Sequence, residues 1–195
     1  MPDAIIKPFG PCLVETSVEE DKVEKIKEFC EKNKNLNIRD KLAGHLDHEY
    51  EINATKLQEI IQFNVDQYKV ILNHYYGYNE QRNLTISAAW VNYMQSGDFN
   101  PLHTHSDCNF SGVIYLSVPK ELEKEAEASV AKGIKPGQIE FTVGTKVPNY
   151  ITSHQFFPKK GSLYIFPHNI LHMVCPFKSN VERVSVAFNL IWSNE

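Results

Sequence analysis

Residues 181–192, with the sequence VERVSVAFNLIW, decide the expected fold. The segment is rich in β-branched and aromatic residues, which is typical of a β-strand. Successive side chains of a strand point to opposite faces, so Arg183 and Ser185 share one face. Val184 and Val186 share the other face. The strand therefore has one apolar face to bury and one face that can carry polar groups.

The chain from residue 83 onward repeats this pattern, with turn residues between the apolar runs. The predicted strands are residues 84–94, 110–118, 138–143, 162–166, 170–175 and 181–192. Strands at this spacing favour a sandwich or barrel over alternating β-α-β units. We therefore expect an antiparallel β-sandwich of jelly-roll type, with an insertion at about residues 119–160 that includes a helix over 121–132.

The N-terminal part, residues 1–82, is expected to be mainly helical. Residues 18–34 and 53–76 carry apolar side chains at helical spacing. Asn53 is the predicted N-cap of the second helix, which stops before Gly77. We expect these helices to buttress the β core and residues 1–195 to form a single domain.

Composition limits the classes of function. The chain has 195 residues, 42% of them hydrophobic, which suffices for one compact core. It carries 20 Lys and Arg against 24 Asp and Glu, so no global cationic field draws in nucleic acid, and a nucleic-acid partner is not expected. The sequence shows no N-terminal signal pattern and no apolar run of about 20 residues. We therefore expect a cytoplasmic protein that does not associate with membranes. The four cysteines lack CxxC pairing and are expected to be reduced thiols.

Residues 97–107, GDFNPLHTHSD, carry the first candidate metal ligands. If this segment is extended, the period of two places His103, His105 and Asp107 on one face, where two or three of them can converge on one ion. Imidazole and carboxylate ligands without a nearby thiolate pair suit Fe(II), Mn or Zn. On spacing alone, histidines of an exposed loop would look the same.

A third candidate ligand, His172, lies in the predicted apolar strand 170–175. Alone, it also fits a core histidine bonded to the backbone. Eleven residues later, Arg183 and Ser185 form a fork of donors that matches a carboxylate. An exposed arginine on the outer sheet face is the alternative. Together, the histidines and the fork indicate a metal site beside a carboxylate site.

With these residues in place, the chain resembles the 2-oxoglutarate and Fe(II)-dependent oxygenases, and in particular a prolyl-4-hydroxylase-like subgroup common in marine phages and bacteria. The resemblance covers residues 84–195 and is carried by four segments: WVNYMQSGDFNPLHTH, SGVIYLSVP, GSLYIFPHNILHMVCP and ERVSVAFNL. It also touches KLAG at residues 41–44 and Glu49-Tyr50. It implies a double-stranded β-helix core of cupin-like type, with Fe(II), 2-oxoglutarate and O₂ as cofactors and ascorbate as a possible accessory reductant. A phage-encoded protein would act in the host cytoplasm.

The family pattern of HxD/E followed by a distant His maps onto this sequence in three ways. A glycine precedes the first metal histidine by about six residues in prolyl hydroxylases, and Gly97 reproduces that spacing to His103. The resemblance then implies the ligands His103, His105 and His172, with His105 in place of the usual Asp. Two other sets stay open, in which Asp107 joins His172 with either His105 or His103.

The resemblance also assigns the cosubstrate contacts. Arg183 and Ser185 would bind the far carboxylate of 2-oxoglutarate. Asn92 and Tyr115, on the strands before and after the histidine segment, would supply further polar contacts, although either residue also fits a structural role. His168, in a Phe-Pro turn, is expected to be exposed.

The predicted function is a non-haem Fe(II) and 2-oxoglutarate-dependent dioxygenase that hydroxylates a protein, a peptide or a small molecule. One alternative is a cupin-like metalloenzyme that does not use 2-oxoglutarate. Another is a non-catalytic zinc protein in which Cys108 or Cys175 completes the three-histidine site. Substrate-selective loops are expected in the N-terminal helices and in the insertion, including residues 146–150. A homodimer is compatible with the sequence, which leaves the oligomeric state open.

Overall fold

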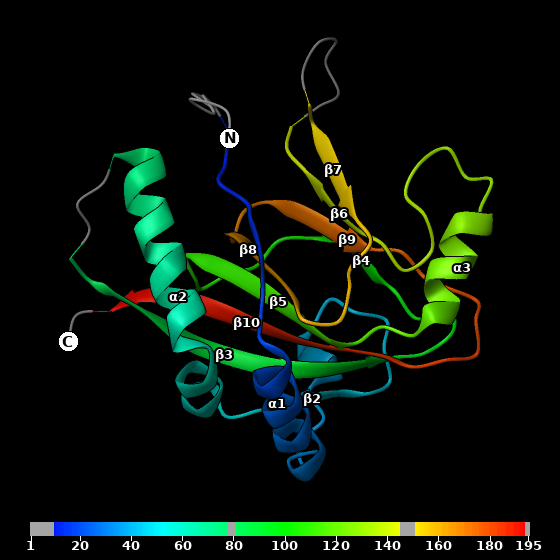
Figure 1. Cartoon of the computed structure of the whole chain (residues 1–195), viewed down its shortest axis with the longest axis horizontal. Coiled ribbons are helices and arrows are strands. Elements are labelled where there is room, and N and C mark those ends of the chain that lie inside the picture. The colour runs from blue at the N-terminus through cyan, green and yellow to red at the C-terminus, as the bar shows by residue number, and fades with distance from the viewer. Residues whose placement is uncertain (1–9, 78–80, 145–150, 194–195) are drawn as a thin grey trace.

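Two antiparallel β-sheets form the framework of the protein in a computed structural model that describes residues 10–77, 81–144 and 151–193 (Figure 1). The strands of the larger sheet are, in spatial order, β1 (Val14–Ser17), β8 (Ser162–Pro167), β5 (Phe110–Ser117), β10 (Arg183–Ser193), β3 (Asn83–Met94) and β2 (Glu49–Glu51). Those of the smaller sheet are β4 (Asn100–His103), β9 (Leu171–Val174), β6 (Ile139–Thr142) and β7 (Ser153–Phe156). Strands adjacent in space are thus often distant in sequence, as in a jelly roll.

Strand β10 is the central strand of the larger sheet, and its alternation is the one that the sequence predicts. It pairs with β3 on one side and β5 on the other. Val184, Val186 and Phe188 are buried in the core beneath the helices. Arg183 and Ser185 lie on the opposite face, where they line a cavity between the sheets.

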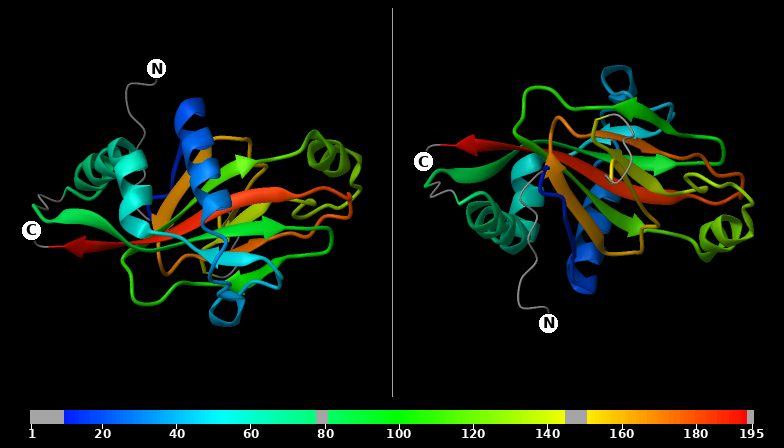
Figure 2. Two further views of the ribbon diagram at one scale, coloured as in Figure 1. Left: turned by 90° about the horizontal axis from the view of Figure 1, so that it is seen from below. Right: turned by 90° about the horizontal axis from the view of Figure 1, so that it is seen from above.

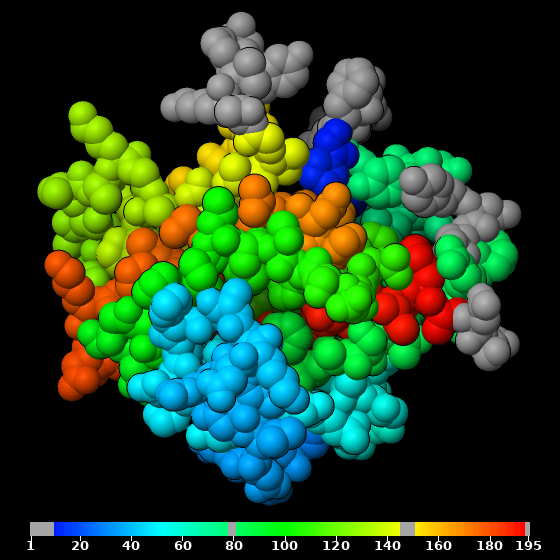
Figure 3. All heavy atoms as spheres, turned by 180° about the vertical axis from the view of Figure 1, so that it is seen from behind, coloured from blue at the N-terminus to red at the C-terminus, as the bar shows by residue number. Residues whose placement is uncertain are grey.

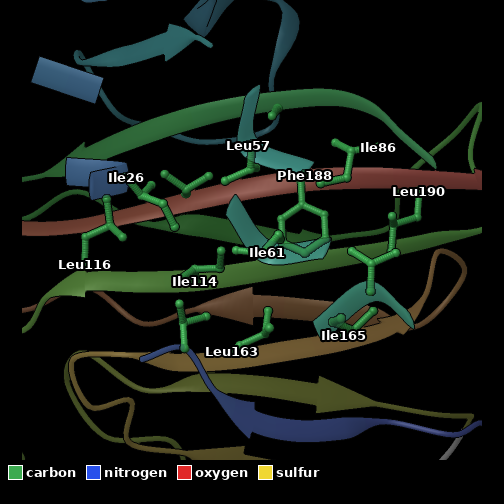
Figure 4. Packing of buried hydrophobic residues seen from close by; sticks show 14 of the residues in the cluster. Ile26, Leu57, Ile61, Ile86, Ile114, Leu116, Leu163, Ile165, Phe188 and Leu190 are labelled. Carbon is green, nitrogen blue, oxygen red and sulfur yellow. The ribbon is translucent and has the colours of Figure 1, made fainter. Parts of the chain in front are cut away.

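Helices α1 (Glu20–Lys32) and α2 (Ala54–Tyr76) cover the outer face of the larger sheet (Figure 2). Ile26 of α1 and Leu57 and Ile61 of α2 point at the sheet, and Phe188 lies among them (Figure 4). Burial of this apolar stripe stabilises both helices on the sheet. The backbone N–H of Lys56 donates to the Asn53 side chain over 2.9 Å, so the predicted N-cap is confirmed.

A second core fills part of the space between the sheets. Phe141 of β6 and Val174 of β9 pack against Tyr164 and Phe166 of β8. This core holds β6 and β9 of the smaller sheet over the inner face of the larger sheet. The sheets therefore enclose a space whose walls carry the polar residues of both.

The structure confirms the expected jelly-roll core with buttressing helices and all six predicted strands, with ends shifted by two residues at most. The helix expected over 121–132 is real but shorter, because α3 spans Lys120–Ala128. The sequence missed β1, β2, β4 and β7, which have three or four residues each. Two of these, β1 and β2, form the edges of the larger sheet, so residues 1–82 contribute strands as well as helices. Within the described residues, no helix is long and apolar enough to cross a membrane.

Candidate metal and cosubstrate site

Three histidines converge between the two sheets. His103 ends β4, His172 lies on β9, and the two residues are direct partners in the strand register. His105 follows in the loop after β4. The potential ligand nitrogens of all three lie within 4.8 Å of one another, and no other group of three His, Cys, Asp or Glu side chains in the described part of the chain converges in this way. The arrangement suits one metal ion.

The backbone fixes the orientation of two of these rings. His103 Nδ1 lies 2.7 Å from the carbonyl oxygen of Pro101, and His172 Nδ1 lies 3.0 Å from that of Ile170. A carbonyl only accepts, so each Nδ1 carries the proton and each Nε2 keeps a free lone pair. His105 Nε2 approaches His172 Nε2 to 3.2 Å. Two nitrogens about 2.1 Å from one ion at a right angle would lie about 3.0 Å apart, so this spacing fits two adjacent ligands.

Burial keeps the histidines neutral. It lowers the pKa of His172 to about 3 and the pKa of His105 to about 4, and the neighbouring imidazoles add to both shifts. Burial also lowers the pKa of His103. A metal ion binds the neutral imidazole, so near pH 7 these rings need lose no proton before they bind one.

The loop that carries His105 is held by His168. The backbone N–H of His105 donates to the carbonyl of His168 over 3.0 Å, and the His168 ring nitrogen Nδ1 donates back to the carbonyl of His105 over 2.9 Å. The expectation that His168 is exposed was wrong, because the residue is half-buried against this loop. Its role could not be seen from spacing, since it depends on a contact between two loops.

Asp107 and the two nearby cysteines lie apart from this group. Asp107 is exposed and has a positive φ of 56°, which turns the chain away after His105. Cys108 is buried, and its thiol contacts Ser111 at 3.8 Å. Neither Cys108 nor Cys175 joins the histidines in the convergent group found among the described residues.

A row of polar residues crosses the inner face of the larger sheet opposite the histidines. Tyr115 of β5, Ser185 of β10, Asn92 of β3 and Glu49 of β2 are successive partners in the strand register. All four are at most 5% exposed. Residues in register share a face of the sheet, so the row points into the space between the sheets. Three of its members were predicted to contact the cosubstrate, and Glu49 was not.

Arg183 lies two residues before Ser185 on β10 and is 2% exposed. Its Nη1 donates to the carbonyl of Gly137 over 3.1 Å, while Nη2 contacts the sulfur of Met94 at 2.7 Å. Its Nε is buried and has no partner in the described ranges, and its guanidinium lies 5.3 Å from the centre of the Tyr115 ring. Burial lowers the pKa of Arg183, and no carboxylate among the described residues pairs with it.

A cavity of about 390 Å³ connects these groups. The three histidines, Arg183 and the polar row all line it. One wall comes from residues 38–49, which precede the predicted β region and include Gly44 and Glu49. Figure 3 shows the hollow between this blue segment and the green residues near 100–106, with red atoms of β10 at its floor. The volume is in the range of small-molecule sites.

The fold and the site together define a jelly-roll protein with a candidate mononuclear metal centre beside an anion site. A sequence profile described as "Putative 2OG-Fe(II) oxygenase" matches residues 88–189, which is more than half of the chain. The chain belongs to this family of 2-oxoglutarate and Fe(II)-dependent oxygenases. The predicted cofactors Fe(II), 2-oxoglutarate and O₂ are thereby confirmed. No curated protein sequence matches the chain significantly.

Solved structures share the double-stranded β-helix fold at low sequence identity. A prolyl-4-hydroxylase from Pseudomonas putida is 17% identical, with a TM-score of 0.62 over 93% of both chains. A viral collagen prolyl hydroxylase from Paramecium bursaria Chlorella virus-1, solved with 2-oxoglutarate, is 13% identical, with a TM-score of 0.56 over 91% of this chain and 94% of its own. HygX from Streptomyces hygroscopicus, solved with nickel and 2-oxoglutarate, is 10% identical, with a TM-score of 0.60 over 93% and 83%. The predicted resemblance to prolyl-hydroxylase-like oxygenases is confirmed.

Proposed function

We propose that His103, His105 and His172 bind the iron of this oxygenase and that Arg183 and Ser185 bind the far carboxylate of 2-oxoglutarate. Of the three ligand sets compatible with the sequence, this one is supported by the convergence of the three ring nitrogens. Its three imidazoles are neutral, so the Fe(II) centre keeps its full double positive charge. That charge favours the dianion of 2-oxoglutarate more than a site with a carboxylate ligand would.

One observation carries the cosubstrate assignment: a buried guanidinium that has no carboxylate partner among the residues that the structure describes lines the same cavity as the three histidines. An unpaired buried charge costs several kcal/mol, and a carboxylate that enters the cavity would remove part of that cost. Arg183 offers a forked set of donors, and Ser185 can add a hydroxyl donor beside it. The cupin-like alternative without 2-oxoglutarate would leave this guanidinium without a ligand.

Two other residues of the polar row, Tyr115 and Asn92, have supporting roles in this proposal. Burial raises the pKa of Tyr115, so its phenol stays protonated and can donate to the same carboxylate. Asn92 has a buried Oδ1 with no partner among the described residues and is the register partner of Ser185, which supports a position of its amide next to the cosubstrate. We assign both residues to cosubstrate orientation.

Iron and 2-oxoglutarate, when bound, use O₂ to release succinate and CO₂ and to place one oxygen atom in a substrate C–H bond. The residues named above would hold the iron and 2-oxoglutarate next to each other in the cavity between the sheets, where the access of water is limited. We propose that the substrate is a peptide, a protein or a small molecule, because the similar folds include prolyl hydroxylases. We also propose that the whole chain acts as one domain, since β1 and β2 complete the larger sheet.

The cosubstrate assignment is tested by anaerobic calorimetric titration of the Fe(II)-loaded protein with 2-oxoglutarate. Arg183→Met keeps most of the side-chain volume but removes the charge and the donors. We expect it to weaken 2-oxoglutarate binding by at least about tenfold, the loss of one charged hydrogen bond, and to leave the iron content unchanged. Equal loss of iron and 2-oxoglutarate binding would contradict the role of Arg183.

A further inference from the structure

Two unpartnered acceptors line the cavity away from Arg183, one on the wall formed by residues 38–49 and one on β4 beside that wall. Glu49 is 1% exposed, and its Oε2 is buried without a hydrogen-bond partner among the described residues. Asn100, at the start of β4, has a buried Oδ1 in the same condition. Both residues line the cavity, and the proposed roles of the metal and cosubstrate residues use neither.

Gly44 brings these two acceptors to one place. A Cβ atom built on Gly44 would overlap Asn100 Oδ1 and lie 3.0 Å from Glu49 Oε1. The backbone of Gly44 is not in the left-handed region, so the missing side chain matters here for the space that it leaves. Asn100 Oδ1 and Glu49 Oε1 therefore both lie against the Cα of Gly44 and close to each other, so a single ligand group that reaches them from the cavity could contact both side chains.

The wall is anchored, so the position of Glu49 is defined. Its backbone carbonyl accepts from Ile38 N over 2.8 Å, and Tyr93 N donates to the neighbouring carbonyl of His48 over 3.0 Å. His45 N donates to the carbonyl of Phe99 over 2.8 Å, which ties the wall to the chain just before Asn100. Residues 38–49 lie outside the matched range 88–189, whereas Asn100 lies inside it.

Glu49 and Asn100 together favour a ligand that carries hydrogen-bond donors. Glu49 Oε2 and Asn100 Oδ1 have no donor within the described part of the chain and are costly to bury, so a ligand N–H that reached each of them would lower that cost. Burial, with a smaller contribution from Asp98, raises the pKa of Glu49 to about 7, so a bound cation would favour its ionised form. An anion such as 2-oxoglutarate would be repelled here.

We propose that Glu49 and Asn100 form a substrate subsite that binds a cationic nitrogen, as an ammonium or a guanidinium group. This proposal depends on the proposed function in one respect, namely that the group bound at this subsite belongs to the substrate. Glu49 lies on β2, two strands from Ser185 on β10, which corresponds to about 10 Å between their backbones. The cation can therefore be held without displacing the cosubstrate from Arg183 and Ser185.

Calorimetric titration with two small probes tests the subsite directly. The probes are n-butylguanidinium and its neutral near-isostere n-butylurea, added to protein loaded with Mn(II) and 2-oxoglutarate, so that no turnover occurs. We expect the wild type to bind n-butylguanidinium at least about tenfold more tightly, as a hydrogen bond to a charged group implies. Glu49→Gln should abolish this preference, and Glu51→Gln, at an exposed position of the same strand, should keep it.

A second variant tests the same volume without altering charge. Gly44→Ala places a methyl group between the two oxygens and should weaken n-butylguanidinium binding at least about tenfold. Equal affinities of the wild type for both probes, or a preference that survives Glu49→Gln, would overturn the subsite. If the wild type did not bind 2-oxoglutarate but still preferred the cationic probe, the proposed cosubstrate role would be refuted and the subsite would be supported.

Discussion

Glu49→Gln should make the metal-free protein more stable above neutral pH, although Glu49 is buried and polar. Burial raises the pKa of this carboxyl from 4.5 to about 7. The unfolded chain therefore ionises Glu49 at a lower pH than the folded chain does. Between these two pKa values the folded state holds more protons, so the free energy of unfolding falls as the pH rises.

The size of the effect follows from the shift. A change from 4.5 to about 7 corresponds to about 3 kcal/mol at 1.36 kcal/mol per pKa unit. This contribution is fully present below about pH 4.5 and is lost by about pH 8. Glutamine resembles the protonated acid in shape and cannot ionise. The variant should match the wild type near pH 4.5 and exceed it by about 3 kcal/mol at pH 8.

Urea unfolding of metal-free wild type and variant at pH 4.5 and pH 8 measures this difference. Metal is left out because its binding stabilises the native state and depends on pH. The histidines with lowered pKa values titrate in both proteins, so their contribution cancels. Glu51→Gln, at an exposed position of β2, serves as the matched control and should show little change between the two pH values. If Glu49→Gln gains nothing over the wild type from pH 4.5 to pH 8, the carboxyl is not held in a desolvating site and the reasoning fails.

Two further substitutions test the framework and the metal loop. Gly112→Ala on β5 directs a Cβ into the ring of Phe188, where it would lie 2.8 Å from the ring atom Cε2. The substitution should lower the free energy of unfolding by about 1–3 kcal/mol, as measured in urea. An unchanged urea midpoint would contradict the packing of this core. His168→Ala removes the side-chain hydrogen bond to the carbonyl of His105. It should weaken the affinity for Mn(II) about tenfold in an equilibrium titration. Unchanged affinity would show that the metal loop does not need the His168 hydrogen bond.

The sequence predicted the parts of the fold that depend on local pattern. Strand alternation in residues 181–192 placed Arg183 and Ser185 on one shared face, which the structure shows to be the inner one. The cap at Asn53 was found because its chemistry is local. Strands β1 and β2 were missed because they are short and gain their stability from pairing with residues far away in the chain. Periodicity cannot reveal such pairing in three or four residues.

The site shows the same division. The HxH spacing made His103 and His105 candidate ligands, and the apolar strand with its following arginine added His172; the structure brings these three rings together. Glu49 was not predicted as a site residue, because nothing in its local sequence shows that β2 pairs with β3 and places it beside Asn92. His168 and Asn100 were missed for the same reason. Their roles arise from contacts across loops and sheets, for which a single sequence offers no direct signal.

The most direct test of the central claim is the visible absorption of the anaerobic protein with Fe(II) and 2-oxoglutarate. Chelation of the iron by the cosubstrate should give a weak metal-to-ligand charge-transfer band in the wild type. His172→Ala should abolish the band, because it removes a proposed iron ligand whose Nε2 lies 3.2 Å from His105 Nε2. Asp107→Ala should retain the band, because this carboxylate is exposed and lies outside the histidine group. Absence of the band in the wild type, or its loss in Asp107→Ala with His105→Ala unaffected, would contradict the three-histidine iron site.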